Sequence, residues 1–391
     1  MSSLIVAGDT SGTVTISAPA VAGTPTLTLP TTSGTIVTSA NISSYVPPTM
    51  KNRIINGNMA IDQRNAGASV TNGTGDTFPV DRFLITGQNA SKFTAQQNAG
   101  SVTPPAGFTN YLGCTSSAAT SLGASDYYLV RQSVEGLNVA DLDWGTANAK
   151  TITISFWVRS SLTGTFGGSL FNSAVNRSYP FSYTISAANT WEQKSITIAG
   201  DTSGTWLKTN GVGIYINWSL GTGSTLSGTA GSWSSTAYVS ATGATSVVGV
   251  SGATFYITGV QLEVGSSATS FEWRPYGNEL ALCQRYYQKF SGGLNGGPYQ
   301  QYGMLSWEGA GAAWGVIPLK TTMRTQPTTA SSGPFTISYG TQGTFINDTN
   351  QTGADLGVFG FSNGSGGAAG YSSYVRSTNS NSAYISFSAE L

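Results

Sequence analysis

Short segments in which hydroxyl and aliphatic residues alternate recur along the whole chain, and they constrain its fold more than any other feature. The first three are TVTISAP at 13–19, TLTLP at 26–30 and GTIVTS at 34–39. Alternation with a period of two is typical of a strand with one buried face. Clusters of Gly, Ser, Asn and Pro separate the segments, as turns require. The pattern predicts an all-β protein rather than a parallel α/β sheet.

The same pattern predicts how the chain is divided. Residues 1–49 contain no aromatic residue before Tyr45 and are too few to bury a core. We expect this segment to dock on a partner, either two further copies of itself or a larger protein. Strand-like segments then fill 50–277, where we predict a jelly-roll sandwich, and 291–391, where we predict a second, sandwich-like β domain.

One segment, NELALCQRYYQKF at 278–290, predicts a helix that connects the two β domains. Leu280, Cys283, Tyr287 and Phe290 are spaced by three, four and three residues, which gives an apolar stripe at helical period. A helix of about 13 residues is unstable alone in water. The stripe must therefore pack, either on the jelly roll of its own chain or on two other copies as a three-helix neck, and we favour the neck.

The preceding segment, SFEWRPYG at 270–277, is predicted to be the last jelly-roll strand. Most aromatic residues of the central region stand inside strand patterns, and we expect them in the core. These core predictions include Trp157, Tyr183, Trp191 and Tyr256.

Charge limits the class of partner. Charged residues make up 9% of the chain, with 17 basic and 17 acidic residues, against about 25% in an average globular protein. The surface must be covered mainly by neutral polar groups, and neither nucleic acid nor an anionic membrane is an expected partner. The N-terminus lacks the pattern of a signal peptide, and no apolar run approaches the roughly 18 residues of a membrane span. We expect synthesis in a cytoplasm and no membrane insertion.

The chain has no histidine, which excludes a Ser-His-Asp triad, a Cys-His dyad and a His-ligated zinc site. Cys114 and Cys283 fit no metal or redox spacing. A disulfide between them stays open, although a buried apolar role is favoured for both. A glycosidase needs only two carboxylates and is not excluded, but we assign no catalytic residue and expect no cofactor.

The tightest acidic pair is Asp141 and Asp143, in DLDWG. On a strand the two carboxylates would share a face and could bind calcium. A turn is the favoured interpretation, so the pair is only a weak candidate for a metal site.

Aromatic residues outside clear strands are better candidates for ligand contact, because Trp and Tyr combine a flat apolar face with a polar tip. Trp233 stands in GTAGSWSSTAY at 228–238, among small residues. It either contacts a ligand or folds back onto the sandwich. We predict carbohydrate binding at Trp218, Trp233, Tyr371 and Tyr374.

Several long segments resemble bacteriophage tail-fibre and receptor-binding proteins. They are NRIINGNMAIDQRNAG with VDRFLITG downstream, GLNVADLDWGTANAKTITISFWVRSSLTGTFGG, NTWEQKSITIAGDTSGTW and ITGVQLEVGSSATSFEWRPYGNELALCQRYYQKF, in order over roughly 50–290. GTVTISAPAVAGTPTLTLPTTSGT is similar to the leading segment of such proteins, and VIPLKTTMRTQPT and AYISFSAEL are similar to their C-terminal β domains. The family pattern often has Trp where Phe83 stands. The resemblance brings no catalytic set and transfers no sugar-binding residue.

The resemblance implies a carbohydrate-binding-module-like jelly roll displayed on the tail of a virion. It implies a homotrimer that attaches to other tail or virion proteins through 1–49 and binds host cell-surface polysaccharide, with 291–391 as the distal tip. Such a protein is made in the host cytoplasm. A non-binding structural or decoration component of tail or capsid is the alternative. A polysaccharide depolymerase is less favoured, because no long β-helical repeat is evident.

Overall fold

The computed structural model describes residues 3–7, 13–17, 50–291, 301–307, 312–337, 341–346, 353–362, 372–378, 380 and 382–391. The chain divides into two compact units, Met1–Thr49 and Met50–Leu391. In the first unit, β1 (Ser3–Ala7) and β2 (Thr13–Ser17) form an antiparallel pair. The docking of this unit on a partner stays a prediction.

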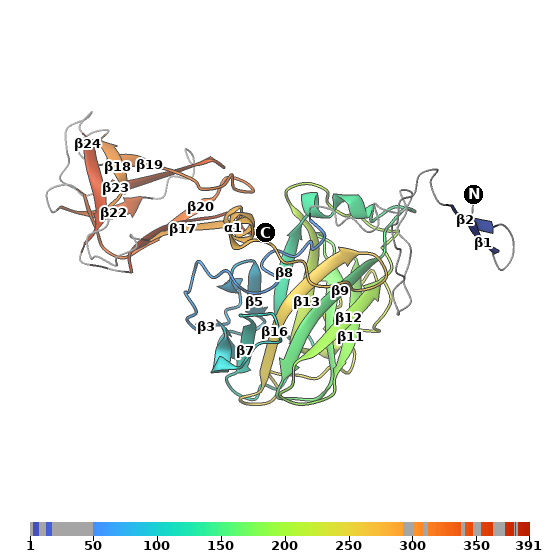
Figure 1. Ribbon diagram of the computed structural model, residues 1–391. Coiled ribbons are helices and arrows are strands. Elements are labelled where there is room, and N and C mark those ends of the chain that lie inside the picture. The colour runs from blue at the N-terminus through green and yellow to red at the C-terminus, as the bar shows by residue number, and fades with distance from the viewer. Residues whose placement is uncertain are drawn as a thin grey trace. The chain divides into compact units, whose positions relative to one another are not determined.

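The all-β prediction is confirmed, because strands fill the described part of the chain and α1 is its single α-helix. Residues 50–264 form a sandwich of two antiparallel six-stranded sheets (Figure 1). Sheet I has the order β11-β10-β13-β8-β5-β4 and sheet II the order β12-β9-β16-β7-β6-β3. The bounds are β3 Val70–Thr71, β4 Thr77–Val80, β5 Phe83–Gly87, β6 Phe93–Gln97, β7 Leu112–Ser116, β8 Tyr127–Glu135, β9 Ile152–Ser160, β10 Gly164–Phe171, β11 Ser178–Ile185, β12 Glu192–Ile198, β13 Val212–Thr222 and β16 Thr254–Val264.

Short elements connect these strands. The described 3-10 turns are η2 Ala99–Ser101, η3 Gly136–Asn138, η4 Ala140–Leu142 and η5 Ser224–Leu226, and β14 (Ser227–Gly228) and β15 (Ser240–Ala241) form a small parallel pair. No helix in the described part of the chain is long and apolar enough to cross a lipid bilayer.

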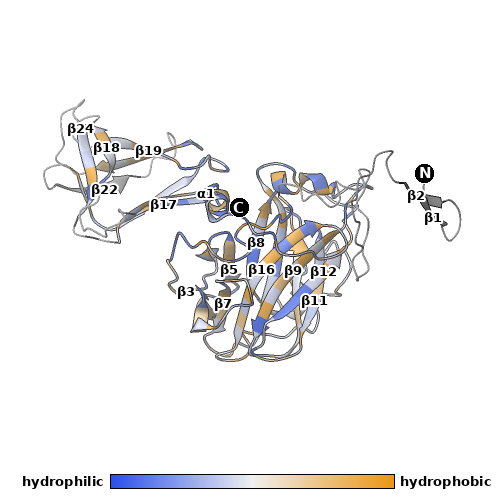
Figure 2. Cartoon of the chain, viewed as in Figure 1, coloured by the Kyte–Doolittle hydropathy of each residue, from blue (hydrophilic) through white to orange (hydrophobic). Residues whose placement is uncertain are grey.

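The core lies between the two sheets, where alternate residues of each strand meet. Figure 2 shows apolar residues interleaved with polar ones along these strands, as the sequence pattern predicts. Trp218 is completely buried there, with its ring 6.3 Å from that of Phe83 and 5.8 Å from that of Phe156. The prediction that Trp218 contacts a ligand is therefore wrong. Its β13 neighbours Asn217 and Ser219 point to the opposite face of the sheet, as strand alternation requires.

The helix prediction is only half right. Helix α1 spans Tyr276–Gln284, and the segment that follows forms strand β17 (Tyr287–Ser291). β17 pairs with β25 (Tyr384–Ser388), which lies about a hundred residues downstream and is invisible to a local pattern. Aromatic residues suit such a paired strand, and tertiary pairing overrides the helical spacing.

The proposed neck residues pack inside their own chain. Cys283 is fully buried against Ile55 and Ile61, and Leu280 packs against the same cluster. Tyr287 is buried, and the guanidinium of Arg64 lies 3.6 Å from its ring centroid. Phe290 packs against the core of the C-terminal barrel. The neck prediction is wrong because these side chains do not form one helical face. The alternative, that the residues pack against their own chain, is confirmed for Leu280 and Cys283.

The C-terminal region forms a closed six-stranded barrel in the order β18-β19-β23-β22-β21-β24 and a three-stranded sheet in the order β17-β25-β20. The sandwich-like expectation for 291–391 is thus refined to a barrel, which removes sheet edges by closure. Its bounds are β18 Gln301–Trp307, β19 Ala312–Pro318, β20 Thr328–Ser332, β21 Phe335–Ile337, β22 Thr341–Ile346, β23 Leu356–Ser362 and β24 Ser372–Ser377.

Candidate functional site

The outer face of sheet II, which points away from sheet I, carries the candidate site. Along β9, Phe156 and Val158 are fully buried in the core, so Trp157 between them points outward and is partly exposed. The strand register places Trp157 opposite Gln193 of β12 on one side and opposite Thr258 of β16 on the other. The core prediction is confirmed for Tyr183 and Tyr256, which are buried, and is wrong for Trp157 and Trp191, which are only partly buried.

A bulge in β16 shapes this face. The register of β16 against β9 shifts between Thr258 and Gln261, and Gly259 inside the bulge has a φ of +62°. A Cβ at Gly259 would lie 2.7 Å from the Phe108 ring and 3.0 Å from the Trp157 ring. Glycine is needed both for the left-handed backbone and for this close approach. The bulge thus lets two aromatic side chains lie directly over the backbone.

Three further contacts extend these rings into a surface. The ring centroids of Phe108 and Phe271 are 5.2 Å apart, and Trp273 lies 4.9 Å from each of them. The Trp273 side chain is 53% exposed. We call Phe108, Trp157, Phe271 and Trp273 the aromatic platform. Flat, exposed aromatic rings offer the apolar face on which the C–H groups of a sugar ring can pack.

A groove of about 350 Å³ lies beside the platform. We call it the polar groove, and its lining consists of Gln193, Lys194, Ser195, Ala268, Thr269 and Ser270. Its two walls adjoin the platform, because Gln193 pairs with Trp157 in register and Ser270 directly precedes Phe271. The Gln193 amide and the hydroxyls of Ser195 and Ser270 can supply donors and acceptors for the hydroxyl groups of a ligand. The Thr269 hydroxyl is engaged by Glu263 and the Lys194 ammonium group by Glu192.

A buried carboxylate holds one wall of the groove. Glu263 is only 2% exposed. Its carboxylate accepts hydrogen bonds from the backbone N–H (2.9 Å) and from the side-chain hydroxyl (2.6 Å) of Thr269. Lys51 Nζ donates to Thr269 Oγ1 (2.8 Å) and to the carbonyl oxygen of Ser270 (2.7 Å). The wall is exposed but fixed, which lowers the entropy lost when a ligand binds.

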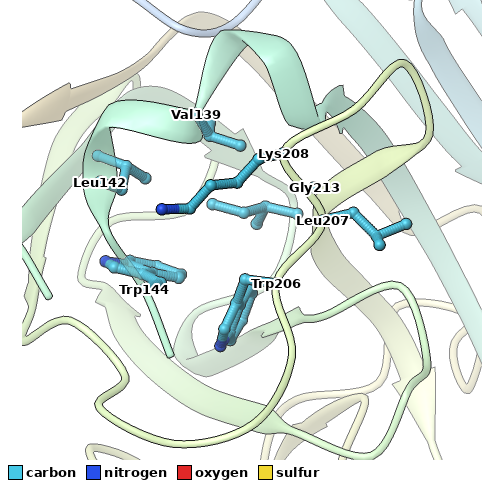
Figure 3. A pocket seen from close by; sticks show the side chains of 8 residues that line it. Val139, Leu142, Trp144, Trp206, Leu207, Lys208 and Gly213 are labelled. Carbon is cyan, nitrogen blue, oxygen red and sulfur yellow. The ribbon is translucent and has the colours of Figure 1, made fainter. Parts of the chain in front are cut away.

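The sandwich end around Trp233 does not form a binding site of similar size. Trp233 packs on the rings of Trp144, Trp206 and Tyr179 at 5.3, 5.4 and 5.1 Å, and its indole N–H donates to the carbonyl oxygen of Ala199 (2.8 Å). The alternative that Trp233 folds back onto the sandwich is confirmed. Figure 3 shows Trp144, Trp206 and neighbouring aliphatic chains converging on a cavity of about 10 Å³, which holds at most about one water molecule.

The acidic pair is not a shared site. Asp141 lies in η4 and pairs with Arg53 (2.8 Å), while Asp143 has a φ of 53° and pairs with Lys208 (3.0 Å). The turn interpretation is confirmed, and each carboxylate has its own cation. Among the described residues, no three acidic or cysteine side chains gather as metal ligands would.

The remaining predicted residues belong to other surroundings. Tyr374 lies in β24 of the barrel, partly buried and opposite Met304, and Tyr371 lies outside the described residues. Cys114 and Cys283 are both buried and form no disulfide, which confirms the favoured prediction of a buried apolar role.

Sequence reasoning missed the most exposed residue of the platform, Trp273. The alternation of Phe271 and Trp273 suggested a strand, but β16 ends at Val264 and 270–275 is irregular. A signal was present in Pro275, which follows two residues after Trp273 and disfavours a central strand.

No protein-family model matches the sequence, and no curated protein matches it. Solved structures do align with part of the chain. A putative sugar-binding protein from Bacteroides thetaiotaomicron aligns with a TM-score of 0.31 and 12% identity, over 55% of this chain and 100% of its own. The family 11 carbohydrate-binding module from Clostridium thermocellum, in complex with a mixed-linked tetrasaccharide, gives 0.26 and 10%, over 52% and 98%.

The enzymatically active domain of tailspike protein 4 from bacteriophage CBA120 aligns with a TM-score of 0.30 and 10% identity. The alignment covers 55% of this chain but only 22% of the tailspike chain. Because these TM-scores are below 0.5, no residue and no activity is transferred from these proteins to this one.

Proposed function

We propose that this protein binds a polysaccharide through the aromatic platform and the polar groove. The observation that carries the proposal is the 53% exposure of Trp273, whose ring packs on Phe108 and Phe271. The groove lined by hydroxyl and amide groups ends at Ser270, three residues before Trp273 in the sequence. A large apolar side chain left in water beside polar groups is typical of a ligand contact. Sugar rings match both parts, with C–H faces for the platform and hydroxyls for the groove.

We further propose that the polysaccharide lies on a bacterial host and that the protein is a tail-fibre or receptor-binding protein of a phage virion. The support is the motif series over roughly 50–290. A homotrimer attached through 1–49 would suit this role, because linked copies turn weak single sites into strong overall binding.

We propose binding without catalysis. The carboxylates beside the groove are already engaged: Glu263 accepts three hydrogen bonds, and Glu192 accepts hydrogen bonds from Lys194 and two backbone N–H groups. A glycosidase needs two carboxylates free to act on a sugar bond.

The test is a glycan array probed with the full chain and with two variants. Trp273→Ala removes the centre of the platform, and Leu137→Ala, at a side chain that is 55% exposed on η3, is the matched control. We expect Trp273→Ala to weaken binding by at least about tenfold, which corresponds to the loss of one stacking contact, and Leu137→Ala to leave it unchanged. Equal binding by all three proteins would contradict the proposed site. If no glycan binds and the protein does not block phage adsorption, the alternative of a structural or decoration component is favoured.

A further inference from the structure

The outer face of sheet I, on the opposite side of the sandwich, carries a second arrangement. Val130 of β8 and Ile216 of β13 lie in the core. The next residue on each strand, Arg131 or Asn217, therefore points outward. The register places Leu84, Arg131, Asn217 and Ser169 side by side across four strands. Three of the four, Arg131, Asn217 and Ser169, form a polar row across the middle of this face.

Hydrogen bonds fix the arginine in that row. Arg131 Nε donates to Asn217 Oδ1 (2.6 Å), and Asn217 Nδ2 donates to Ser169 Oγ (3.0 Å). Asn217 and Ser169 are fully buried. The Arg131 guanidinium also lies over the ring of Tyr215, 4.7 Å from its centroid. The cation–π contact and the Nε hydrogen bond leave both terminal nitrogens able to donate to a ligand.

Arg131 has no carboxylate partner, a property that it shares with Arg159 and Arg324 among the described arginines. Arg177 and Arg285 each hold a carboxylate with two nitrogens, from Asp201 and Glu135 respectively. No carboxylate of the described residues lies within 4.0 Å of Arg131, and its Nη atoms have no hydrogen-bond partner among those residues. They are not among the buried unsatisfied atoms, so they reach solvent.

Burial of this cation is unfavourable in the absence of a ligand. Burial lowers the pKa of the Arg131 guanidinium, and the electrostatic effects of Tyr215, Asp76 and Tyr127 oppose this shift. Asp76 is exposed and stays beyond ion-pair distance. Arg131 is partly buried and has no paired anion, so an anionic ligand would supply the missing partner.

We propose that Arg131 binds the carboxylate of an acidic sugar on the outer face of sheet I. The two Nη atoms form the planar fork that matches a carboxylate. The partly buried rings of Tyr127 and Tyr215 lie on the same face, where they pack against the cluster of Leu84, Leu129, Phe171 and Val239. This inference goes beyond the function proposed above, because it names the chemical class of the ligand and uses the other sheet. Either site can fail without the other.

The experiment is an array that carries uronic-acid and sialic-acid oligosaccharides, each beside its methyl ester, with sulfated neutral oligosaccharides as a third group. The full chain should bind at least one acid at least about tenfold more tightly than its ester. Arg131→Gln should abolish that difference, Arg131→Lys should restore part of it, and Trp273→Ala should leave the ratio of acid to ester binding unchanged. Asp76→Asn, at an exposed position, should strengthen acid binding, since it removes a competing charge.

Any of four results would overturn the inference. The first is that no acid binds better than its ester, even if neutral glycans bind the platform. The second is that the preference persists in Arg131→Gln, with thermal unfolding as the check that this variant is folded. The third is that sulfated neutral sugars bind as tightly as the carboxylic acids, which would mean that Arg131 binds anions in general rather than a carboxylate. If Arg131→Gln does not fold, the Asp76→Asn variant provides the test. The inference is wrong if this variant binds acidic sugars no more tightly than the wild-type chain.

Discussion

The rings of Phe108 and Trp273 lie with their centroids 4.9 Å apart on the outer face of sheet II, although 165 positions separate them in the sequence. Gly259 contributes to this arrangement, because its missing Cβ lets Phe108 and Trp157 approach the backbone of β16. The candidate glycan surface therefore depends on a residue that has no side chain of its own.

Gly259→Ala should damage the platform and the fold together. The new methyl group would meet the Phe108 and Trp157 rings at 2.7 and 3.0 Å, at a φ of +62°. We expect a loss of about 1–3 kcal/mol in the free energy of unfolding, measured by urea denaturation, and weaker glycan binding. Gly243→Ala is the control for backbone strain alone, since Gly243 also has positive φ but open space at its Cβ. Equal glycan binding by both variants would argue against the role of Gly259.

Asp81 should make stability depend on pH. Burial raises the pKa of Asp81 to about 6, against the opposing effects of Arg64 and Gln63. The folded protein therefore holds this proton more tightly than the unfolded chain, whose carboxyl titrates near pH 4. The contribution of Asp81 favours the fold most below about pH 4 and is lost as the pH rises to about 6.

Asp81→Asn should remove up to about 3 kcal/mol of this dependence. Urea unfolding at intervals between pH 4 and 7 measures it, with Asp76→Asn, at an exposed carboxylate, as the control. The prediction is wrong if wild type and Asp81→Asn lose the same free energy across this range.

Both cysteine thiols should resist alkylation in the native protein. Burial raises the pKa of Cys114 and of Cys283, and the thiolate is the reactive form. We expect no iodoacetamide adduct under native conditions and two adducts per chain in urea, counted by mass spectrometry without reductant. A single adduct, or none, in urea would indicate a disulfide that the structure does not contain.

Tyr287→Ser should destabilise the fold without changing the number of chains in the assembly. The ring is buried, and the Arg64 guanidinium lies on it at 3.6 Å, so its loss should cost about 2–4 kcal/mol. Light scattering gives the oligomeric state and urea denaturation the stability. Dissociation of an oligomer with unchanged unfolding would restore the neck that the structure contradicts.

Local alternation in the sequence predicted the class of fold, because a two-residue period survives in β9 and β13 whatever surrounds them. It misplaced Trp218, since the same period predicts two faces without telling which is buried. It also extended the helix through Tyr287, because the partner strand of β17 comes from the far end of the chain. The platform escaped prediction for a similar reason, since Phe108 and Trp273 meet only after the sandwich has formed.

The pairing of β17 with β25 has a consequence for how such a protein can diversify. Ser291 and Tyr384 are opposite each other in the register, so the chain departs and returns within about 5 Å. Recombination that joined a different sequence to these two positions could replace the barrel and leave the sandwich core unchanged. The new sequence would also have to supply a strand to pair with β25, as β20 does, and the contacts that Arg324 makes with Arg285 and Asn210.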